Sequence, residues 1–393
     1  MTKHVLFIYG TRVRRDEKGE LYCGLNEKVW DRYRKWGNDL TFLGVLVRGI
    51  YSSKELQSTS NLLTNIHFVE YFKQNTIKTF FDIRIKFKNK SIIRTEIDKA
   101  NIIIIRMPTQ DGGYALRYAL KRNKRTIVEV VGCPFDALWN HSWKGKLLAI
   151  FRMMELKRNI KHAPNVIYVT NEFLQKRYPT KGKSIGCSDV ALKNVDDTVL
   201  QKRLSKISTS SKEIVLGTIG GYAVKYKCQD ILIRIVAELK NRGYQVKGQL
   251  VGGGDSSDLV KLAKRLEVID NIDFIGSLKH EDIFKWLDTL DFYMQLSKQE
   301  GLPRSVVEAM SRGVPCIGSK VGGIPELIQP ELCFCHDKKM VKNIVNSIIV
   351  MIDNPTLLKE VSIHNFNKAK KYEYHFLENK RDEFLMSCLE NIK

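Results

Sequence analysis

The chain has 393 residues, of which 27% are charged and 43% hydrophobic, and its formal net charge is +22. This length predicts two domains, each large enough to bury its own core. Ordinary contents of 26 Gly and 9 Pro exclude collagen-like and low-complexity proteins, and the longest apolar runs are far shorter than a membrane span. The first residues lead directly into an apolar stretch without a signal-peptide cleavage region, so we expect a cytoplasmic protein.

The first half alternates short apolar runs with helical patterns, which predicts a parallel sheet covered by helices on both faces. We assign it to a first domain, residues 1–190. Its predicted strands are Val5–Tyr9, Leu40–Val47, Ile66–Val69, Ile102–Arg106, Thr126–Val131 and Val166–Thr170. Its predicted helices are Asn26–Trp36, Gly113–Arg122 and Trp143–Lys161.

A polar stretch, residues 191–212, interrupts this alternation and predicts a linker. A second α/β alternation follows, which we assign to a domain at residues 213–371. Its predicted strands are Ile214–Ile219, Gln245–Val251, Ile272–Ile275, Phe292–Leu296 and Val314–Ser319. Its predicted helices are Gln229–Arg242, Asp258–Glu267, Glu281–Leu290 and Pro303–Arg312. Ligands of open α/β sheets bind beyond the carboxyl ends of the strands.

Two carboxylates flank the start of the helix that Pro303 opens. Glu300 lies in the preceding loop, and Glu308 follows eight residues later. The first amides of a helix are unpaired donors at the positive end of its dipole, which suits an anion. Carboxylates beside them can accept hydrogen bonds from sugar or ribose hydroxyls. The alternative is an ordinary loop before a helix with a solvated Glu.

Glycines follow several predicted strands of the second half, and they predict the mouth of a nucleotide pocket. None of these loops is a complete dinucleotide or P-loop motif, so each is weak by itself. The glycine-bearing stretches are Gly217–Gly221, Gly252–Gly254 and Gly322–Gly323, and Lys225 and Lys227 lie just beyond the first.

Together these stretches resemble the retaining GT-B glycosyltransferases of family 4, the glycosyl transferases group 1. The resemblance implies two Rossmann-like α/β domains with parallel sheets facing a central cleft, the first for the acceptor and the second for a nucleotide-sugar. Residues 132–189 resemble bacterial surface and capsular polysaccharide enzymes of this family. The matching stretches are Gly220–Asp230, Val251–Gly254, Phe274–Leu278, Glu300–Glu308, Gly313–Pro315 and Gly322–Glu326.

The resemblance also implies roles for single residues. Glu308 would bind ribose hydroxyls, Glu300 would contact the donor sugar, and Lys227 would neutralise the diphosphate leaving group. The catalytic residues are then Glu300 and Lys227. The other residues expected at the donor are Gly301, Leu302, Pro303, Lys225, Gly220, Gly221, Gly253, Leu278, Gly10 and Thr11.

Two positions depart from the family pattern. The arginine expected before the lysine is Tyr222, so Lys225 or Arg12 would have to help neutralise the diphosphate. The histidine that many members carry is absent from residues 131–136. Asp136 or His141 could replace it, although a loop Asp and a surface His are the simpler interpretation.

We therefore expect a hexosyltransferase-type enzyme that moves a sugar from a UDP-sugar to a glycan or lipid-linked glycan in bacterial surface polysaccharide synthesis. The resemblance implies retention by same-face attack, with no cofactor and no metal ion. A nucleotide-sugar epimerase or hydrolase of the same fold, or a non-catalytic nucleotide-sugar-binding partner subunit, are the alternatives. The helix expected at 372–393 would pack on the first domain or form a dimer contact.

The excess positive charge lies in the N-terminal half. Residues 1–190 hold 35 Lys and Arg against 17 Asp and Glu, whereas residues 191–393 hold 30 against 26. An anionic membrane, an acidic substrate or nucleic acid could each explain this charge. No nucleic-acid-binding motif accompanies it, so we expect no nucleic-acid partner.

Two basic segments of this half also carry bulky apolar residues. Lys73–Arg94 includes Lys86 and Lys88, and Trp143–Lys161 places Trp143 and Phe151 on one helical stripe. Either these segments touch an anionic membrane, which would make the protein peripheral at the inner face, or their apolar residues face the core.

The eight cysteines are scattered through hydrophobic segments. Only Cys333 and Cys335 are close in sequence, and their spacing does not match a zinc site. We predict that both are buried on one face of a strand, and that all eight are reduced.

Overall fold

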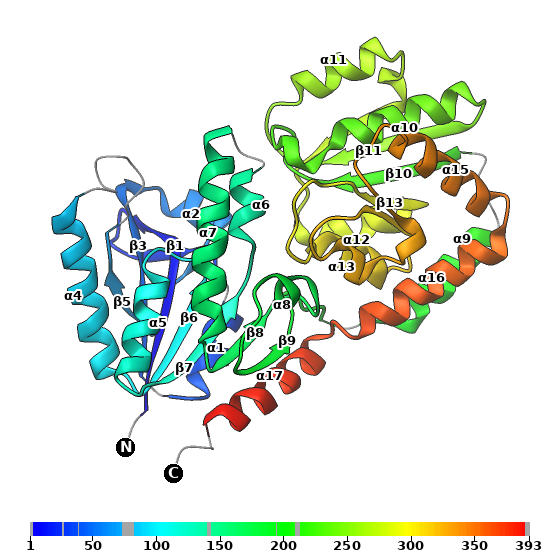
Figure 1. The fold of residues 1–393 in the computed structure, drawn as a ribbon. Helices are drawn as coiled ribbons and strands as arrows, with labels where there is room; N and C mark the ends of the chain where they lie inside the picture. Colours follow the sequence, from blue (N-terminus) through cyan, green and yellow to red (C-terminus); the bar gives the residue numbers. More distant parts are fainter. Residues whose placement is uncertain are drawn as a thin grey trace. The chain divides into compact units, whose positions relative to one another are not determined.

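The computed structural model describes residues 3–25, 27–37, 39–72, 82–139, 143–193, 195–208 and 213–389, apart from the side chains of 58, 59, 143, 144 and 389. The chain divides into two compact units (Figure 1). Unit 1 comprises Met1–Leu138, Trp143–Cys187 and Asp382–Lys393, and unit 2 comprises Trp139–Ser142 and Ser188–Arg381. None of the helices in the described ranges combines the length and apolarity needed to cross a membrane.

Unit 1 is built on a nine-stranded sheet. Seven strands pair in parallel in the order β5-β3-β1-β6-β7-β8-β9. The strands are β1 (His4–Asp16), β2 (Leu21–Cys23), β3 (Asp39–Tyr51), β4 (Asn61–Leu62), β5 (His67–Glu70), β6 (Ile102–Met107), β7 (Arg125–Val130), β8 (Asn165–Tyr168) and β9 (Lys183–Gly186). The expectation of a purely parallel sheet is wrong at β2 and β4, because β2 pairs antiparallel with β1 and β4 pairs antiparallel with β2.

Strand β1 is longer than predicted. The register with β3 shifts between Ile8 and Arg12, so three residues of β1 lie opposite a single residue of β3. A β-bulge of this kind lets a strand continue past an irregular stretch. Gly10 and Thr11, which we expected after the strand, therefore lie within it.

Helices α4 (Ile83–Lys99), α5 (Gly112–Lys121) and α7 (Trp143–Lys161) lie side by side over one face of this sheet (Figure 1). Helix α1 (Glu27–Arg34) packs on the other face, where Trp30 and Tyr33 contact Phe7 and Phe42. Burial of these apolar surfaces holds the helices on the sheet. Shorter helices are α2 (Ser53–Thr59), α6 (Pro134–Trp139) and α8 (Phe173–Arg177).

Unit 2 is a parallel six-stranded sheet in the order β12-β11-β10-β13-β14-β15. Numbered along this half, the order is 3-2-1-4-5-6, which is the doubly wound dinucleotide-binding topology. The strands are β10 (Glu213–Ile219), β11 (Gln245–Val251), β12 (Ile272–Gly276), β13 (Phe292–Gln295), β14 (Cys316–Ser319) and β15 (Cys333–Phe334).

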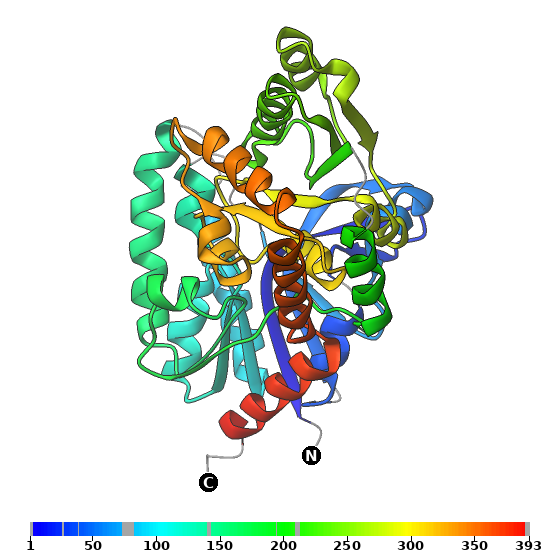
Figure 2. The same cartoon turned by 90° about the vertical axis from the view of Figure 1, so that its right-hand side faces the viewer.

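The helices of unit 2 follow the predicted alternation, and α16 runs beside α9 and α13 (Figures 1 and 2). They are α9 (Asp197–Ser208), α10 (Gln229–Asn241), α11 (Ser257–Arg265), α12 (His280–Thr289), α13 (Arg304–Ser311), α14 (Ile324–Leu327), α15 (Met340–Ile352), α16 (Pro355–Lys370) and α17 (Tyr374–Leu389). Short 3-10 turns are η1 (Lys225–Lys227), η2 (Ile269–Asn271) and η3 (Pro330–Leu332).

The predicted linker differs from what its residues form. Most of it is helix α9, whose Arg203 is buried against carbonyl groups of unit 2. A buried guanidinium that bonds several carbonyls fixes α9 as part of the domain. Residues 194 and 209–212 of the predicted linker lie outside the described part of the chain.

The last helix, α17, contributes its second half to unit 1. Asp382 forms an ion pair with Lys35 at 2.9 Å, and Phe384 and Leu385 are buried. The part of this helix that belongs to unit 1 therefore begins at Asp382. The helix predicted to pack on the first domain began at residue 372, ten residues earlier. Residues 390–393 lie outside the described part.

The cysteine prediction is wrong at one position. All eight thiols are free, as expected, but strand β15 ends at Phe334, so Cys333 is buried while Cys335 is exposed. Burial raises the pKa of the Cys333 thiol to about 11, which keeps it protonated and inert at neutral pH.

Candidate active site

The candidate site lies where the strand order of unit 2 reverses. Strands β10 and β13 are neighbours in the sheet, but the connections that leave their carboxyl ends run in opposite directions. Such a switch point is where doubly wound sheets bind ligands. The loop after β10 carries Lys227, and the loop after β13 carries Glu300 and Pro303.

Glu300 and Lys227 meet at this point. Lys227 Nζ lies 2.6 Å from Glu300 Oε1, and both side chains are mostly buried. The same carboxylate oxygen accepts hydrogen bonds from Gln295 Nε2 at 2.8 Å and from Ser297 Oγ at 2.9 Å. Three donors on one oxygen fix the orientation of the carboxylate. Its other oxygen, Oε2, has no hydrogen-bond partner among the residues that the structure describes.

Hydrogen bonds at the end of β13 hold the Gln295 side chain in this arrangement. Gln295 Oε1 accepts hydrogen bonds from the Tyr293 hydroxyl and the Ser305 hydroxyl, both at 3.0 Å. Burial raises the pKa of Tyr293, so its hydroxyl stays a donor at neutral pH. The amide of Gln295 is thereby held with its nitrogen toward Glu300. The sequence analysis did not assign Gln295, Ser297 or Ser305 to the site, although all three are close to Glu300 in the sequence.

The backbone of the Glu300 loop is clamped by the glycine turn after β14. Gly322 has a φ of +58°, and a side chain there would overlap the carbonyl oxygen of Glu300. The next residue, Gly323, donates its amide hydrogen to the carbonyl of Gly301 at 2.8 Å. Ser319 Oγ donates to the carbonyl of Ser297 at 2.6 Å. These contacts explain why a glycine pair follows β14.

A second pair of glycine loops meets at the ends of β10 and β11. A side chain at Gly252 would overlap the carbonyl oxygen of Gly220, and a side chain at Gly220 would press on the Lys227 stem. Gly253 accepts a hydrogen bond from the Tyr222 amide at 2.9 Å. The structure therefore places Gly220 beside the Lys227 stem and Gly221 near the carbonyl of Gly253.

Tyr222, which occupies the position of the family arginine, ties two strands together. Its hydroxyl donates to the carbonyl of Leu250 at 2.9 Å and accepts from the amide of Gly276 at 2.8 Å. Its ring packs edge-on against Phe274 at 5.9 Å. Tyr222 therefore supports the ends of β11 and β12, and it supplies no positive charge. Lys225, one of the suggested replacements, is exposed on η1.

Glu308 lies on the inner side of α13 and is only 3% exposed. His280 Nε2, at the start of α12, donates to Glu308 Oε1 at 3.0 Å, and the second oxygen has no partner among the described residues. Burial raises the pKa of Glu308, while His280 and Arg304 lower it to a smaller extent. Sequence inspection missed His280. It lies two residues after Leu278, which is half-buried in the loop that follows β12.

The remaining predicted residues lie in unit 1. The Gly10 amide donates to Thr109 Oγ1 at 2.7 Å, and Thr11 is the next residue of the β1 bulge. Asp136 is held by Arg177 at 2.7 Å, so it is part of an ion pair at the end of β7. His141 lies outside the described residues. Arg12 is exposed on β1.

The apolar stripe of α7 faces solvent. Phe151 and Met154 are each 62% exposed, whereas Leu156 and Ile160 of the same helix are buried. The interpretation that this stripe faces the core is therefore wrong. Trp143 begins α7, but its side chain lies outside the described part. In the other basic segment, residues 73–81 also lie outside it.

Helix α4 contributes the described residues of that segment. Phe87 is 69% exposed, Lys86 is half-buried, and the ammonium of Lys88 lies 4.3 Å from the centre of the Phe72 ring. Within the described ranges, no group of three or more His, Cys, Asp or Glu side chains is arranged to hold a metal ion.

The candidate site lies within a stretch of the chain that matches a known protein family. Residues 202–370 match the family model for glycosyl transferases group 1. The chain is 28% identical over 392 residues to Protein CapJ of Staphylococcus aureus, covering 98% of this chain and 95% of CapJ. It is 25% identical over 260 residues to the O-antigen biosynthesis glycosyltransferase WbnH of Escherichia coli, covering 64% of this chain and 68% of WbnH.

The fold also matches a solved structure, that of Anabaena Alr3699/HepE in complex with UDP. The TM-score is 0.65 at 16% sequence identity, with 98% of this chain and all of that chain covered. A second structure of HepE, in complex with UDP-glucose, matches with a TM-score of 0.62.

The fold is that of the GT-B glycosyltransferases, and Glu300 and Glu308 lie within the residues that match the glycosyl transferases group 1 model. Residues 202–370 match the glycosyl transferases group 1 family, which confirms that part of the resemblance identified from the motifs in this half of the chain.

Proposed function

We propose that this enzyme transfers a sugar, with retention of configuration, from a UDP-sugar to a glycan or lipid-linked glycan during bacterial surface polysaccharide synthesis. The observation that carries the proposal is the pair Lys227 and Glu300, 2.6 Å apart at the switch point of the group 1 domain. The choice of UDP is supported by the fold match to HepE, which binds UDP and UDP-glucose. The choice of pathway is supported by the similarity to WbnH.

The donor would be held by groups already in position. In the proposed complex, Glu308 binds the ribose hydroxyls through its free oxygen, and Glu300 binds sugar hydroxyls through Oε2. The backbone amides of Gly301 and Leu302 and those of the first turn of α13, which Pro303 precedes, hold the diphosphate. Pro303 precedes the helix without a side-chain cap, which leaves those amides available as donors.

The proposed chemistry needs charge stabilisation more than a dedicated base. Breaking the anomeric C–O bond places positive charge on the sugar ring and negative charge on the departing diphosphate. Lys227 and the helix amides stabilise that negative charge before the reaction begins. The departing phosphate accepts the acceptor's proton as the new C–O bond forms on the same face. No metal ion and no cofactor take part in this proposal.

The alternatives differ in what happens after cleavage. A hydrolase would release UDP without an acceptor, an epimerase would return an epimeric nucleotide-sugar with no net release of UDP, and a non-catalytic subunit would bind the nucleotide without turnover. The ordered contacts of Glu300 with Lys227, Gln295 and Ser297 favour an enzyme, since a binding subunit has no need for this arrangement at the sugar end.

We also propose that unit 1 contacts an anionic membrane at the cytoplasmic face. The exposed apolar side chains of α4 and α7 support this, together with the basic residues on the same helices. Sedimentation with vesicles that contain 30–40% phosphatidylglycerol, compared with neutral vesicles, tests it. Equal pelleting with both kinds of vesicle, or with neither, would contradict it.

The donor site is tested by titration calorimetry with UDP, GDP and ADP. We expect UDP to bind at least about tenfold more tightly than the other two, which corresponds to about 1.4 kcal/mol. Glu308→Gln should weaken this binding, whereas the surface change Glu331→Gln on η3 should not. Equal binding of all three nucleotides would contradict the choice of UDP.

A further inference from the structure

Two adjoining hollows lie on the face of unit 1 that carries α4, α5 and α7. A basic cavity of about 340 Å³ lies where β6 and β7 end. An apolar groove of about 870 Å³ lies between α5 and α7. The two hollows share Arg117, Glu155 and Asn159 in their walls. A single ligand that enters both would meet a charged and an apolar surface.

The basic cavity carries an excess of positive charge. Its carboxylates are engaged by the protein, since Glu155 pairs with Arg152 at 2.9 Å and Asp111 Oδ2 accepts from Gln110 Nε2 at 3.2 Å. Four cationic side chains against these two carboxylates leave a balance of about +2, which suits an anionic group with two charges. The cationic side chains are Lys86, Lys90, Arg117 and Arg152.

The cavity also lies at the edge of the sheet where doubly wound domains bind ligands. Thr109, in its wall, follows β6 and accepts the hydrogen bond from the Gly10 amide. Pro134, from the stretch after β7, completes this edge. The basic cavity is thus at the functional edge of unit 1.

The groove is more apolar than the basic cavity, although Arg158 and His162 also line it. Its floor is formed by Leu116, which is buried, and by Leu120 of α5. Its far wall is formed by Phe151 and Met154, which remain 62% exposed although both are apolar. Covering such side chains with a hydrocarbon chain is favourable at roughly 25 cal/mol per Å² of apolar surface. The groove lacks an apolar occupant from the described part of the chain.

We propose that the composite hollow binds the lipid anchor of the acceptor, a diphosphate esterified to a long hydrocarbon chain. The diphosphate occupies the basic cavity, and the first part of the chain lies in the groove between α5 and α7. A diphosphate diester carries two negative charges, which matches the balance in the cavity. This inference rests on the proposed function, because it specifies which of the two acceptor classes, a free or a lipid-linked glycan, the enzyme uses.

The test measures binding of geranylgeranyl diphosphate to the full-length protein, below its micelle concentration and without vesicles. Two fragments serve for comparison: geranylgeraniol lacks the charged diphosphate, and inorganic diphosphate lacks the hydrocarbon chain. We expect the complete amphiphile to bind at least tenfold more tightly than either fragment. Lys90→Glu, in the cavity, and Phe151→Ser, in the groove, should each weaken its binding at least tenfold.

Matched controls are available on the same helix α7. Lys157→Glu makes the same change of charge outside both hollows, and Leu147→Ser replaces a side chain that is 72% exposed and lines neither hollow. Both should bind the amphiphile like the wild type. Equal losses in these controls would show a diffuse membrane-type surface and overturn the inference, as would equal affinity for inorganic diphosphate.

UDP binding separates this inference from the proposed function. All four variants should bind UDP as the wild type does, because their changes are in unit 1. Loss of UDP binding by the wild type would contradict the proposed donor site and leave the amphiphile result intact. Normal UDP binding with no binding of geranylgeranyl diphosphate would overturn only the lipid-anchor site.

Discussion

Glu308 combines deep burial with a role that requires a charge. Burial raises its pKa, so the folded protein holds the proton of this carboxyl more tightly than the unfolded chain does. The stability linked to this group is therefore fully present at acid pH and is lost as the pH rises through the pKa of the folded state. Wherever this carboxyl is ionised in the ligand-free protein, its burial lowers the stability of the fold.

We expect Glu308→Gln to raise the melting temperature of the ligand-free protein at pH 8, since a neutral amide keeps a hydrogen bond to His280 without a buried charge. The gain should shrink as the pH is lowered toward 4.5. The same variant should lose roughly tenfold to a hundredfold in UDP affinity, as expected for a lost hydrogen bond to a charged group. Thermal scans from pH 4.5 to 8, paired with UDP titrations, measure both effects, and Glu331→Gln is the surface control. A variant less stable than the wild type at pH 8 would contradict this explanation.

Lys227 is proposed to act in the chemical step. Lys227→Met keeps the length of the stem that packs near Gly220 but removes the charge beside Glu300. We expect kcat to fall by about 10²–10³, as when one preorganised donor is removed from an active site, with a smaller effect on the affinity for UDP. Steady-state kinetics test this, with Lys261→Met on α11 as a control that should retain full activity. An unchanged kcat in Lys227→Met would remove Lys227 from the catalytic residues.

The glycine turn after β14 sets the position of the Glu300 loop. Gly322→Ala places a Cβ against the Glu300 carbonyl in a backbone conformation that disfavours side chains, so it should both destabilise unit 2 and weaken donor binding. Gly243→Ala is a matched control, because its φ is +87° but no atom lies within 4 Å of the added Cβ. Gly243→Ala should lower the free energy of unfolding by only about 1–2 kcal/mol, because a residue with a side chain disfavours the left-handed conformation. Denaturant unfolding and UDP titration of both variants decide the matter, and equal losses in the two would contradict the clamp.

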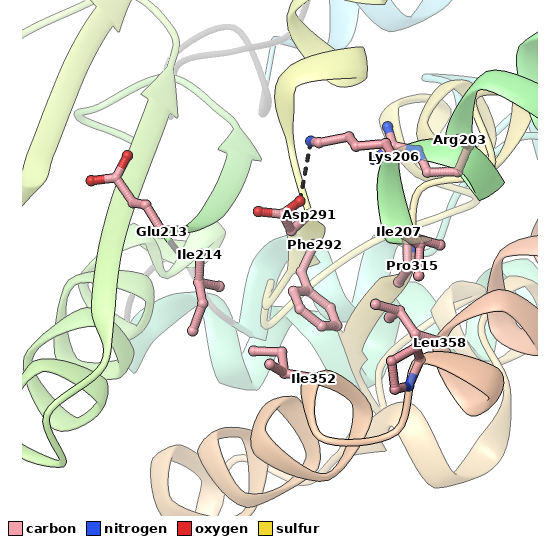
Figure 3. Close-up of a pocket in the computed structure, with 11 residues that line it drawn as sticks. Arg203, Lys206, Ile207, Glu213, Ile214, Asp291, Phe292, Pro315, Ile352 and Leu358 are labelled. Atoms are coloured by element: carbon pink, nitrogen blue, oxygen red, sulfur yellow. Dashed lines mark ion pairs between the residues drawn. The ribbon is translucent and has the colours of Figure 1, made fainter. Parts of the chain in front are cut away.

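Helix α9 is fixed at the opposite, amino-terminal edge of the unit 2 sheet. Arg203 donates to the carbonyls of Leu287, Leu290 and Arg312, at the ends of α12 and α13. It thereby satisfies carbonyl groups that the two helices leave unpaired at their carboxyl ends. Arg203 also lines a cavity of about 220 Å³, together with Lys206, Asp291 and Phe292 (Figure 3).

Arg203→Met should lower the free energy of unfolding by about 2–4 kcal/mol, because buried carbonyl acceptors lose their donors. Lys206→Met, in the wall of the same cavity, should cost less, about 1 kcal/mol, since Lys206 is partly exposed in its ion pair with Asp291. Neither change touches the carboxyl edge of the sheet, so UDP affinity should stay as in the wild type. Urea unfolding with parallel UDP titration measures both, and a reversed order of the two losses would contradict the role of Arg203.

At the scale of elements, the alternation of apolar runs and helical patterns predicted most strands and helices of unit 2. The pattern failed where tertiary contacts decide the outcome. Arg203 looks like a solvated residue in a polar stretch, because only the folded domain supplies the carbonyls it binds. The bulge at Gly10 depends on the pairing of β1 with β3, and local sequence does not encode that pairing.

The candidate site was predictable only in part for a similar reason. Glu300, Glu308 and Lys227 stood out through their spacing from glycine loops and strands. His280 and Gln295 did not, because their role follows from which strand ends are neighbours in the sheet. Tyr222 could be recognised as a departure from the family pattern, but its bridge between β11 and β12 is visible only in three dimensions.

For the whole molecule, the two units divide the properties of the chain between them. Unit 2 holds the carboxylates, the glycine loops and the lysine expected to act on the donor. Unit 1 holds most of the excess positive charge, together with exposed apolar side chains on α4 and α7. A neutral, soluble acceptor would make no use of that combination. An anionic amphiphile or a membrane surface would use all of it.

The proposed sugar transfer is best tested by measuring nucleoside diphosphate release from UDP-, GDP- and ADP-sugars, with and without a bacterial lipid extract as acceptor. The wild type should release UDP from one UDP-sugar only when acceptor is present, and Glu308→Gln should lose this release. The same result should hold with EDTA added. Release that is independent of acceptor would identify a hydrolase, and no release from any donor despite UDP binding would point to an epimerase or a non-catalytic subunit. Either result would contradict the proposed transfer.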